Sequence, residues 1–421
     1  MAVPDTSDFE LRFRFGPLSH SADQQSQSTQ LTPAEYTRAK EIFDAILGAL
    51  EESSSFDKGA YLHRKVRSPD QDRYRPLELI RHTLDHVHMS SQGSFLELFF
   101  ASISLYFKRD DSDISECIGY LEDFRESETK FDKLKTAIPK FAHSLVENFF
   151  IPLMASGGKT RQPTPADEPL HADSEEAARV TAARLSSLRR DCLKRDGYRC
   201  VITGTIDDDH VKSFTGEHGE SVFKDPYGNP VSLEENRASE VLEVAHIIPH
   251  SLLAGRLVDG DTVLVKPKRM AYQILRMFDP DVVGSINGVG IDRPFNAMTL
   301  THRCHTLFGK FKIVFDEMGG QEYKIHTANK KNDKMEPVVR TLVARDGVEP
   351  VARGLLAIHR AIATILHLSA AGEYIEKLIR DNEDMEGGGV LSPNGSTSIG
   401  DYIYWKLCGS QGGIIEMSHV S

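Results

Sequence analysis

The stretch FNAMTLTHRCHTLF (Phe295–Phe308) decides the fold of the central part of this chain, because it places Asn296 nine residues before His305. Fifty residues upstream of Asn296, the stretch VLEVAHIIPHS (Val241–Ser251) contains His246. A neutral imidazole can take a proton from water near pH 7, an amide can hold a loop in shape, and a second imidazole can bind a metal ion. The order His, Asn, His therefore predicts one centre to which all three side chains contribute.

Both stretches carry patterns that indicate local structure. The residues around His246 are apolar and largely β-branched, which predicts a buried strand ended by Pro249, since proline lacks a backbone donor. His302 and His305 lie three residues apart and would share one face of a helix. That helix is predicted because the apolar residues after Asn296 fall close to helical spacing, up to Gly309: Met298, Leu300, Cys304, Leu307 and Phe308.

Four motifs, in this order over about a third of the chain, resemble the HNH endonuclease family, in the branch found among fungal proteins. The motifs are RRDCLKRDGYRCVITG (189–204), AHIIPHS (245–251), FNAMTL (295–300) and HTLFGKFKIVF (305–315). Any one of these motifs alone would be a weak signal. Their order and the step of nine residues from Asn296 to His305 make the resemblance specific.

The resemblance implies a ββα-metal fold and a metal-dependent endonuclease that hydrolyses phosphodiester bonds of DNA. It implies that His246 is the general base that activates water, and that Asn296 orients the loop of His246. His305 would bind a divalent metal ion (Mg, Mn, Zn or Ni), with His302 as a second candidate ligand. The alternative for an isolated histidine in such a strand is a buried, hydrogen-bonded core residue.

Two positions depart from the family pattern. Ala245 stands where many members carry a metal ligand before the base histidine, and Gly309 stands where a second helix ligand is usual. One imidazole does not bind Mg²⁺ or Zn²⁺ tightly, so we expect another side chain to contribute. Glu243, three residues before His246, is expected on the opposite face of a regular strand. The nearest candidates in sequence are Glu243, His250, Asp292, Asp316 and Glu317.

These departures leave a second function open: an HNH domain that binds nucleic acid or protein without cutting. The net charge of −12 is unfavourable for DNA binding as a whole, so local charge matters more. Basic residues cluster between Arg184 and Arg199, largely within the first motif, and beside the proposed metal helix, and they could form one basic face or simply solvated helix faces. The candidate nucleic-acid-binding residues are Arg189, Arg190, Lys194, Arg195, Arg303 and Lys310.

The cysteines and the hydropathy of the chain indicate whether disulfides and membrane spans are expected. The five cysteines are scattered and no CxxC pair exists, so the zinc knuckles of many bacterial HNH domains are missing, and Cys200 is expected in the core. We expect no disulfide framework, no membrane span and an intracellular location, nuclear or cytoplasmic. The acidic balance outside the HNH region also makes a protein partner plausible.

The sequence predicts an α+β protein in which a ββα-metal (HNH) domain is flanked by an N-terminal all-α domain and a C-terminal helical extension. Thr32 and Glu35 form a capping box at the start of the first helix. The long insertion between His250 and Asn296 is a candidate lid or recognition loop. The predicted parts are a disordered N-terminus (1–30), a helical domain (31–154), a linker (155–174), a nuclease-like domain (175–330), the C-terminal helical extension (331–385) and a Gly/Ser-rich tail (386–421).

Overall fold

The computed structural model describes thirteen stretches of the chain. The predictions for residues 1–30, 158–174 and 386–421 lie outside them. The described residues are 31–54, 56, 74–109, 114–157, 175–218, 222–224, 230–232, 239–253, 256–258, 261–263, 266–286, 288–328 and 335–385.

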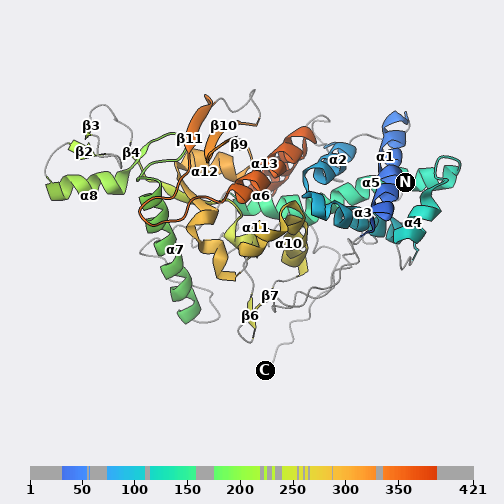
Figure 1. Ribbon diagram of the computed structural model, residues 1–421, viewed down its shortest axis with the longest axis horizontal. Coiled ribbons are helices and arrows are strands. Elements are labelled where there is room, and N and C mark those ends of the chain that lie inside the picture. The colour runs from blue at the N-terminus through green and yellow to red at the C-terminus, as the bar shows by residue number, and fades with distance from the viewer. Residues whose placement is uncertain are drawn as a thin grey trace.

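The described residues between 31 and 157 are almost entirely helical; α1, α3, α4 and α5 lie at one end of the molecule, and α6 lies near its centre (Figure 1). Thr32 and Glu35 form the predicted capping box at the start of the first helix. The centre of this region is a set of phenyl rings packed edge to face, such as Phe43 on Phe99 at 4.9 Å and Phe99 on Phe141 at 5.2 Å. The helices are α1 (Pro33–Glu52), α2 (Pro76–His86), α3 (Gln92–Tyr106), α4 (Ile114–Leu121), α5 (Glu128–Leu145) and α6 (Ile151–Gly157).

The rest of the described chain mixes helices with small sheets. Strands β9 (Ile313–Gly319), β10 (Glu322–Thr327) and β11 (Val338–Thr341) form an antiparallel sheet in the order β11-β10-β9. The other strand pairs are β1 (Ile206–Asp207) with β4 (Ser239–Glu240), β2 (Val222–Lys224) with β3 (Pro230–Ser232), β5 (Glu243–His246) with β8 (Ala297–Leu300), and β6 (Arg256–Val258) with β7 (Asp261–Val263). The helices are α7 (Glu175–Arg195), α8 (Asp208–His218), α9 (His250–Leu253), α10 (Lys266–Phe278), α11 (Pro280–Ser285), α12 (His302–Gly309), α13 (Arg353–Leu368) and α14 (Ala371–Met385).

Strand β8 corrects one prediction about the segment after Asn296. The apolar spacing suggested a helix from there onward, but residues 297–300 are an extended strand that pairs antiparallel with β5. All four residues of β8 are buried, so the strand has no exposed face and lacks the alternation of a half-buried strand. Helix α12 begins only after Thr301, whose side chain accepts a hydrogen bond from the Cys304 N–H as an N-cap.

The insertion between His250 and Asn296 is not a simple lid. Its main helix, α10, packs into the core through one apolar face. Phe278 at its end stacks on Phe149 of the N-terminal region at 5.9 Å. An element packed into the core on this scale is part of the scaffold rather than a mobile cover. The buried side chains of α10 are Met270, Ala271, Tyr272, Ile274, Leu275, Met277 and Phe278.

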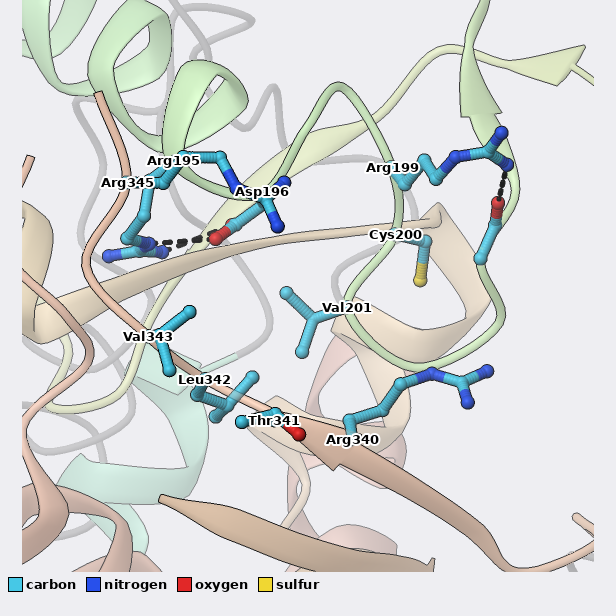
Figure 2. Close-up of a pocket in the computed structure, with 11 residues that line it drawn as sticks. Arg195, Asp196, Arg199, Cys200, Val201, Arg340, Thr341, Leu342, Val343 and Arg345 are labelled. Atoms are coloured by element: carbon cyan, nitrogen blue, oxygen red, sulfur yellow. Dashed lines mark hydrogen bonds and ion pairs between the residues drawn. The ribbon is translucent and has the colours of Figure 1, made fainter. Parts of the chain in front are cut away.

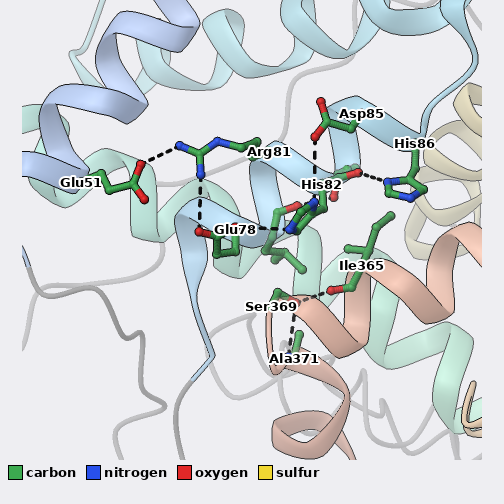
Figure 3. A network of polar contacts seen from close by, with 11 residues as sticks. Glu51, Glu78, Arg81, His82, Asp85, His86, Ile365, Ser369 and Ala371 are labelled. Atoms are coloured by element: carbon green, nitrogen blue, oxygen red, sulfur yellow. Dashed lines mark hydrogen bonds and ion pairs between the residues drawn. The ribbon is translucent and has the colours of Figure 1, made fainter. Parts of the chain in front are cut away.

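Helix α2 links the two ends of the described chain (Figure 3). The N–H of Arg75, just before α2, donates to the Ser369 carbonyl between α13 and α14 at 2.8 Å. Arg81 on α2 reaches Glu51 of α1 at 3.0 Å and Glu78 of its own helix at 3.4 Å. One continuous apolar core runs from the N-terminal helices to α14. The predicted domain boundaries therefore stay predictions.

Among the described helices, no single one is long and apolar enough to cross a membrane. Residues of α13 and α14 reach that length only as a pair bent by 88°. The apolar side chains of α13, such as Leu355 and Ile362, are buried in the protein core.

Candidate functional site

His246 lies at the end of β5 with its side chain only 1% exposed. Its Nε2 is 3.2 Å from Oδ1 of Asp292, and Nδ1 of His250 is 2.8 Å from the same oxygen. Asp292 ends a short 3₁₀ helix (Gly288–Asp292) inside the insertion. The insertion therefore supplies a carboxylate that orients two imidazoles.

The charges of this cluster follow from its burial. Burial lowers the pKa of His246, and the hydrogen bond and charge of Asp292 offset this only in part. Burial alone would raise the pKa of Asp292, but hydrogen bonds from His246 and His250 hold that pKa well below its usual range. The cluster therefore combines an ionised carboxylate with a neutral His246 near pH 7.

The two ring nitrogens of His246 have different surroundings. Because Nε2 faces a carboxylate, it carries the hydrogen and donates it, which leaves the lone pair of a neutral imidazole on Nδ1. Nδ1 is buried and has no hydrogen-bond partner in the described structure. A buried acceptor without a partner is uncommon and is often a sign of function. This atom is the candidate proton acceptor.

Asn296 holds the backbone on both sides of this cluster. Its side-chain Oδ1 accepts from the Ile248 N–H at 3.0 Å, and Nδ2 donates to the carbonyls of Ile248 at 3.1 Å and Ile291 at 2.9 Å. The Asn296 side chain is fully buried, so each of these bonds is costly to lose. Asn296 thereby joins the chain after His246 to the chain before Asp292.

Glu243, at the start of β5, forms a second cluster with the first turn of α12. Its Oε1 lies 2.8 Å from Nδ1 of His302, and its Oε2 lies 2.6 Å from Nδ1 of His305. The hydrogen bond with His305 is the largest influence on the pKa of Glu243, which is lowered despite burial. Glu243 therefore reaches the predicted metal ligand His305 from a cluster separate from that of His246.

The strand register explains how Glu243 reaches α12. Glu243 pairs with Leu300 across the β5–β8 ladder, and α12 starts two residues after Leu300. The first turn of that helix therefore lies directly beside the start of β5. A register cannot be read from the sequence of β5 alone, because β5 and β8 are separated by the whole insertion.

The described side chains do not offer a ready metal site. Within the described ranges, no group of three or more His, Cys, Asp or Glu residues is placed to hold a metal ion. Glu243, His302 and His305 are engaged with one another instead. Asp316 pairs with His326 and Arg360, and Glu317 pairs with Arg353, so neither carboxylate reaches this cluster.

The two positions that lack family ligands serve packing here. Ala245 is fully buried in the core, where a longer polar side chain would need new space. Gly309 is buried against the end of α6, so close that a Cβ added to Gly157 would lie 2.3 Å from the Gly309 carbonyl oxygen. The end of α12 is thus fixed by backbone contact.

The predicted nucleic-acid-binding residues do not form one group. Arg195 is a correction: its guanidinium is buried and donates to Asp196 and to the carbonyls of Pro294 and Ala297, so it stabilises the fold and is not on an exposed face. Arg189 bonds to the Leu242 carbonyl and pairs with Asp207 and Asp209, and Lys310 pairs with Glu376. The exposed members of the set are Arg190, Lys194 and Arg303.

The cysteines of the described chain are buried and free, in line with the expectation of no disulfide framework; Cys408 lies outside the described residues. Cys200 is a core residue, as expected, and lies beside Cys304 of α12. A hydrogen bond from the Cys304 thiol, offset in part by burial, lowers the pKa of Cys200.

One comparison with known proteins finds a match for this part of the chain. A family model described as HNH endonuclease matches residues 200–316, which include β5, β8 and α12. No curated protein and no solved structure matches the chain. The matched segment contains His246, Asn296 and His305 in the order of the motifs, and residues 200–316 are an HNH endonuclease family segment.

Proposed function

We propose that this protein is an endonuclease that hydrolyses phosphodiester bonds of DNA, with His246 as the general base. The observation that supports this proposal is the buried pair of His246 and Asp292, in which Nδ1 of a neutral imidazole has no partner. A neutral imidazole that is already oriented by a carboxylate is suited to accept a proton.

In the proposed step, Nδ1 of His246 takes a proton from water while the water oxygen forms a bond to phosphorus. The bond between phosphorus and the leaving oxygen then breaks. Asp292 stabilises the imidazolium that forms, and Asn296 keeps the two segments that carry His246 and Asp292 in register. His246 therefore accepts the proton, and Asp292 stabilises the positive charge that results on its ring.

HNH nucleases typically use a divalent metal ion, which would neutralise charge on the phosphate and on the leaving oxygen. Such an ion would have to be coordinated by Glu243, His302 and His305. In the described structure they are closed on each other by hydrogen bonds and do not form a donor set. We therefore assign no step to a metal.

A second function competes with the first: an HNH domain that binds nucleic acid without cutting it. It is favoured by the missing donor set among the described residues and by the burial of His246, whose side chain is 1% exposed. Substrate water would have to reach Nδ1 for cleavage to occur. The two functions differ in one measurable outcome, which is strand scission.

The test is nicking of supercoiled plasmid by the full chain with Mg²⁺, Mn²⁺, Ni²⁺ or Zn²⁺ in turn and with a chelator. His246→Ala is compared with wild type and with His326→Ala, which removes an imidazole paired with Asp316 on another sheet. Cleavage that is lost only in His246→Ala supports the nuclease and identifies its base. Binding of the plasmid without nicking under every condition, by folded protein, supports the binding module.

A further inference from the structure

A cavity of about 230 Å³ lies outside the candidate site, between the loop that follows α7 and the segment around β11 (Figure 2). None of Glu243, His246, Asp292 or His305 lines it. Four arginines and one aspartate are its only charged lining residues. The lining residues are Arg195, Asp196, Arg199, Cys200, Val201, Gly204, Arg340, Thr341, Leu342, Val343 and Arg345.

The one acid in the cavity is already neutralised. Asp196 accepts hydrogen bonds from Arg195 at 2.7 and 3.0 Å, and from the backbone and hydroxyl of Thr299, each at 2.8 Å. Arg195 and Asp196 together carry no net charge. The positive charge on which the argument rests therefore comes from Arg199 and Arg340.

Arg199 and Arg340 are held in place without being neutralised. Arg199 donates to the Gly204 carbonyl at 2.9 Å (Figure 2), and Arg340 donates to the Ile202 carbonyl at 2.9 Å. A carbonyl oxygen orients a guanidinium but carries no full negative charge. Neither arginine forms an ion pair with any carboxylate of the described residues.

Both side chains are partly buried, so the cavity concentrates positive charge where water screens it poorly. Each guanidinium has five N–H groups, and the carbonyls engage only some of them. A bound anion would offset this charge and use the remaining donors. Of the common anions, phosphate matches a set of guanidinium groups especially well, because its oxygens accept paired hydrogen bonds.

We propose that this cavity is a phosphate-binding pocket, with Arg199 and Arg340 as the principal ligands to the phosphoryl oxygens. A cavity of about 150 Å³ can hold a benzene ring, so about 230 Å³ accommodates a phosphate together with part of an attached sugar or base. Val201, Leu342 and Val343 provide an apolar wall for such a group. The phosphate belongs either to a nucleic-acid strand or to a free mononucleotide.

The pocket is joined to the candidate site through β8. Thr299 of β8 donates its hydroxyl to Asp196 and receives the Val201 N–H on its own carbonyl at 2.9 Å. The same strand pairs with β5, which carries His246. Binding in the pocket does not require cleavage, so its test is independent of whether the protein cuts DNA.

The experiment is titration calorimetry of the full chain with three probes: inorganic phosphate, thymidine 5′-monophosphate, and a single-stranded oligodeoxynucleotide without a terminal phosphate. Wild type is compared with Arg199→Gln and Arg340→Gln, which keep side-chain donors but remove the charge. Arg38→Gln on α1, which removes a guanidinium paired with Glu122, is the matched control. We expect each pocket variant to weaken binding by about tenfold or more, and the control to bind as wild type.

Val343→Glu is a second variant that leaves both arginines intact. Val343 is 41% exposed and lines the pocket, so its replacement should preserve folding while its carboxylate competes with phosphate. Loss of mononucleotide binding in all three pocket variants supports the free-nucleotide source, and loss of oligonucleotide binding supports the strand source. Absence of binding by every probe at millimolar concentration, or equal affinity in wild type and folded pocket variants, would overturn the proposal.

Discussion

Two clusters of the same chemistry lie at the two ends of β5, and they differ in burial. At the end of the strand, one oxygen of Asp292 serves both His246 and His250, and the His246 side chain is 1% exposed. At the start, the two oxygens of Glu243 serve one imidazole each, and the His302 side chain is 79% exposed. The same combination of one carboxylate and two imidazoles thus contains a fully buried Asp292 at one end of β5 and a Glu243 that is 24% exposed at the other.

The largest expected effect comes from the buried cluster. Asp292→Asn should lower the nicking rate by about 100- to 10,000-fold, because the amide removes the charge that orients His246 and stabilises its protonated form. The measurement is the initial rate of plasmid nicking at pH 7.5. Asp316→Asn, which changes a carboxylate that also holds a histidine and an arginine, should keep the wild-type rate. A wild-type rate in Asp292→Asn would remove Asp292 from the mechanism.

A second prediction concerns the packing that holds α12 in place. The cluster around Glu243 depends on this helix, because His302 and His305 lie on it. His359 of α13 stacks on Phe308 of α12 at 3.9 Å and bonds to its carbonyl at 3.0 Å. Burial lowers the pKa of His359 to about 4, although the bond to Phe308 opposes this. The unfolded chain takes up this proton near pH 6.5, so folding stability falls as pH drops from 6.5 towards 4, by about 3 kcal/mol in total.

The check is the free energy of unfolding by urea at pH 7 and at about pH 4.5. The decrease in the free energy of unfolding from pH 7 to about pH 4.5 should be smaller in His359→Asn than in wild type. His367→Asn, on the exposed face of the same helix, should keep the full loss. An unchanged pH dependence in His359→Asn would show that His359 is not the group that titrates.

The bridge at the start of β5 is expected to contribute less than the buried pair. Glu243→Gln should reduce nicking by about 10- to 100-fold, the usual effect of removing a carboxylate that orients a functional imidazole. The rate is measured under the metal conditions that give the fastest nicking in wild type. Glu317→Gln, which changes a carboxylate paired with Arg353, is the control. An effect as large as that of Asp292→Asn would contradict the distinction between the two clusters.

The smallest expected effect is on the pH profile. Nicking requires neutral His246, so its rate rises with pH through the pKa of that residue. Because burial lowers this pKa, the acid limb should lie below pH 6.5. At pH 6 an unperturbed imidazole is about one quarter neutral, so the rate relative to the plateau should exceed that fraction by up to about fourfold. A limb with its midpoint above pH 6.5 would show that His246 is not the base, or that it is not buried in the active form.

The sequence supported some structural predictions better than others. The helix over residues 33–52 is long and begins at the predicted capping box, and the structure has it where the pattern placed it. Strand β8 was mistaken for the start of a helix, since a strand buried on both faces lacks alternation. The three-stranded sheet β9–β11 was not anticipated, and its edge strand β11 alternates only between half-buried and exposed residues.

Some residues of the candidate site could be predicted from the sequence, and others could not. His246, Asn296 and His305 were selected from residue type and spacing, and the structure places them on β5, at the end of the short 3₁₀ helix (Pro294–Asn296) before β8, and on α12. The two carboxylates were not separable in sequence from other nearby acids. Asp292 reaches His246 across 46 residues, and Glu243 reaches His305 across 62.

By itself, the sequence determined the family match of residues 200–316, because the motifs keep a fixed order and spacing, and it predicted His246, Asn296 and His305 as one centre from residue types that can move a proton or bind a metal. Only the tertiary structure decided which acid serves which histidine, which arginine is buried, and where unpaired positive charge collects. Those properties depend on strand register and on the loss of water at each position, and both arise from contacts between segments far apart in the chain.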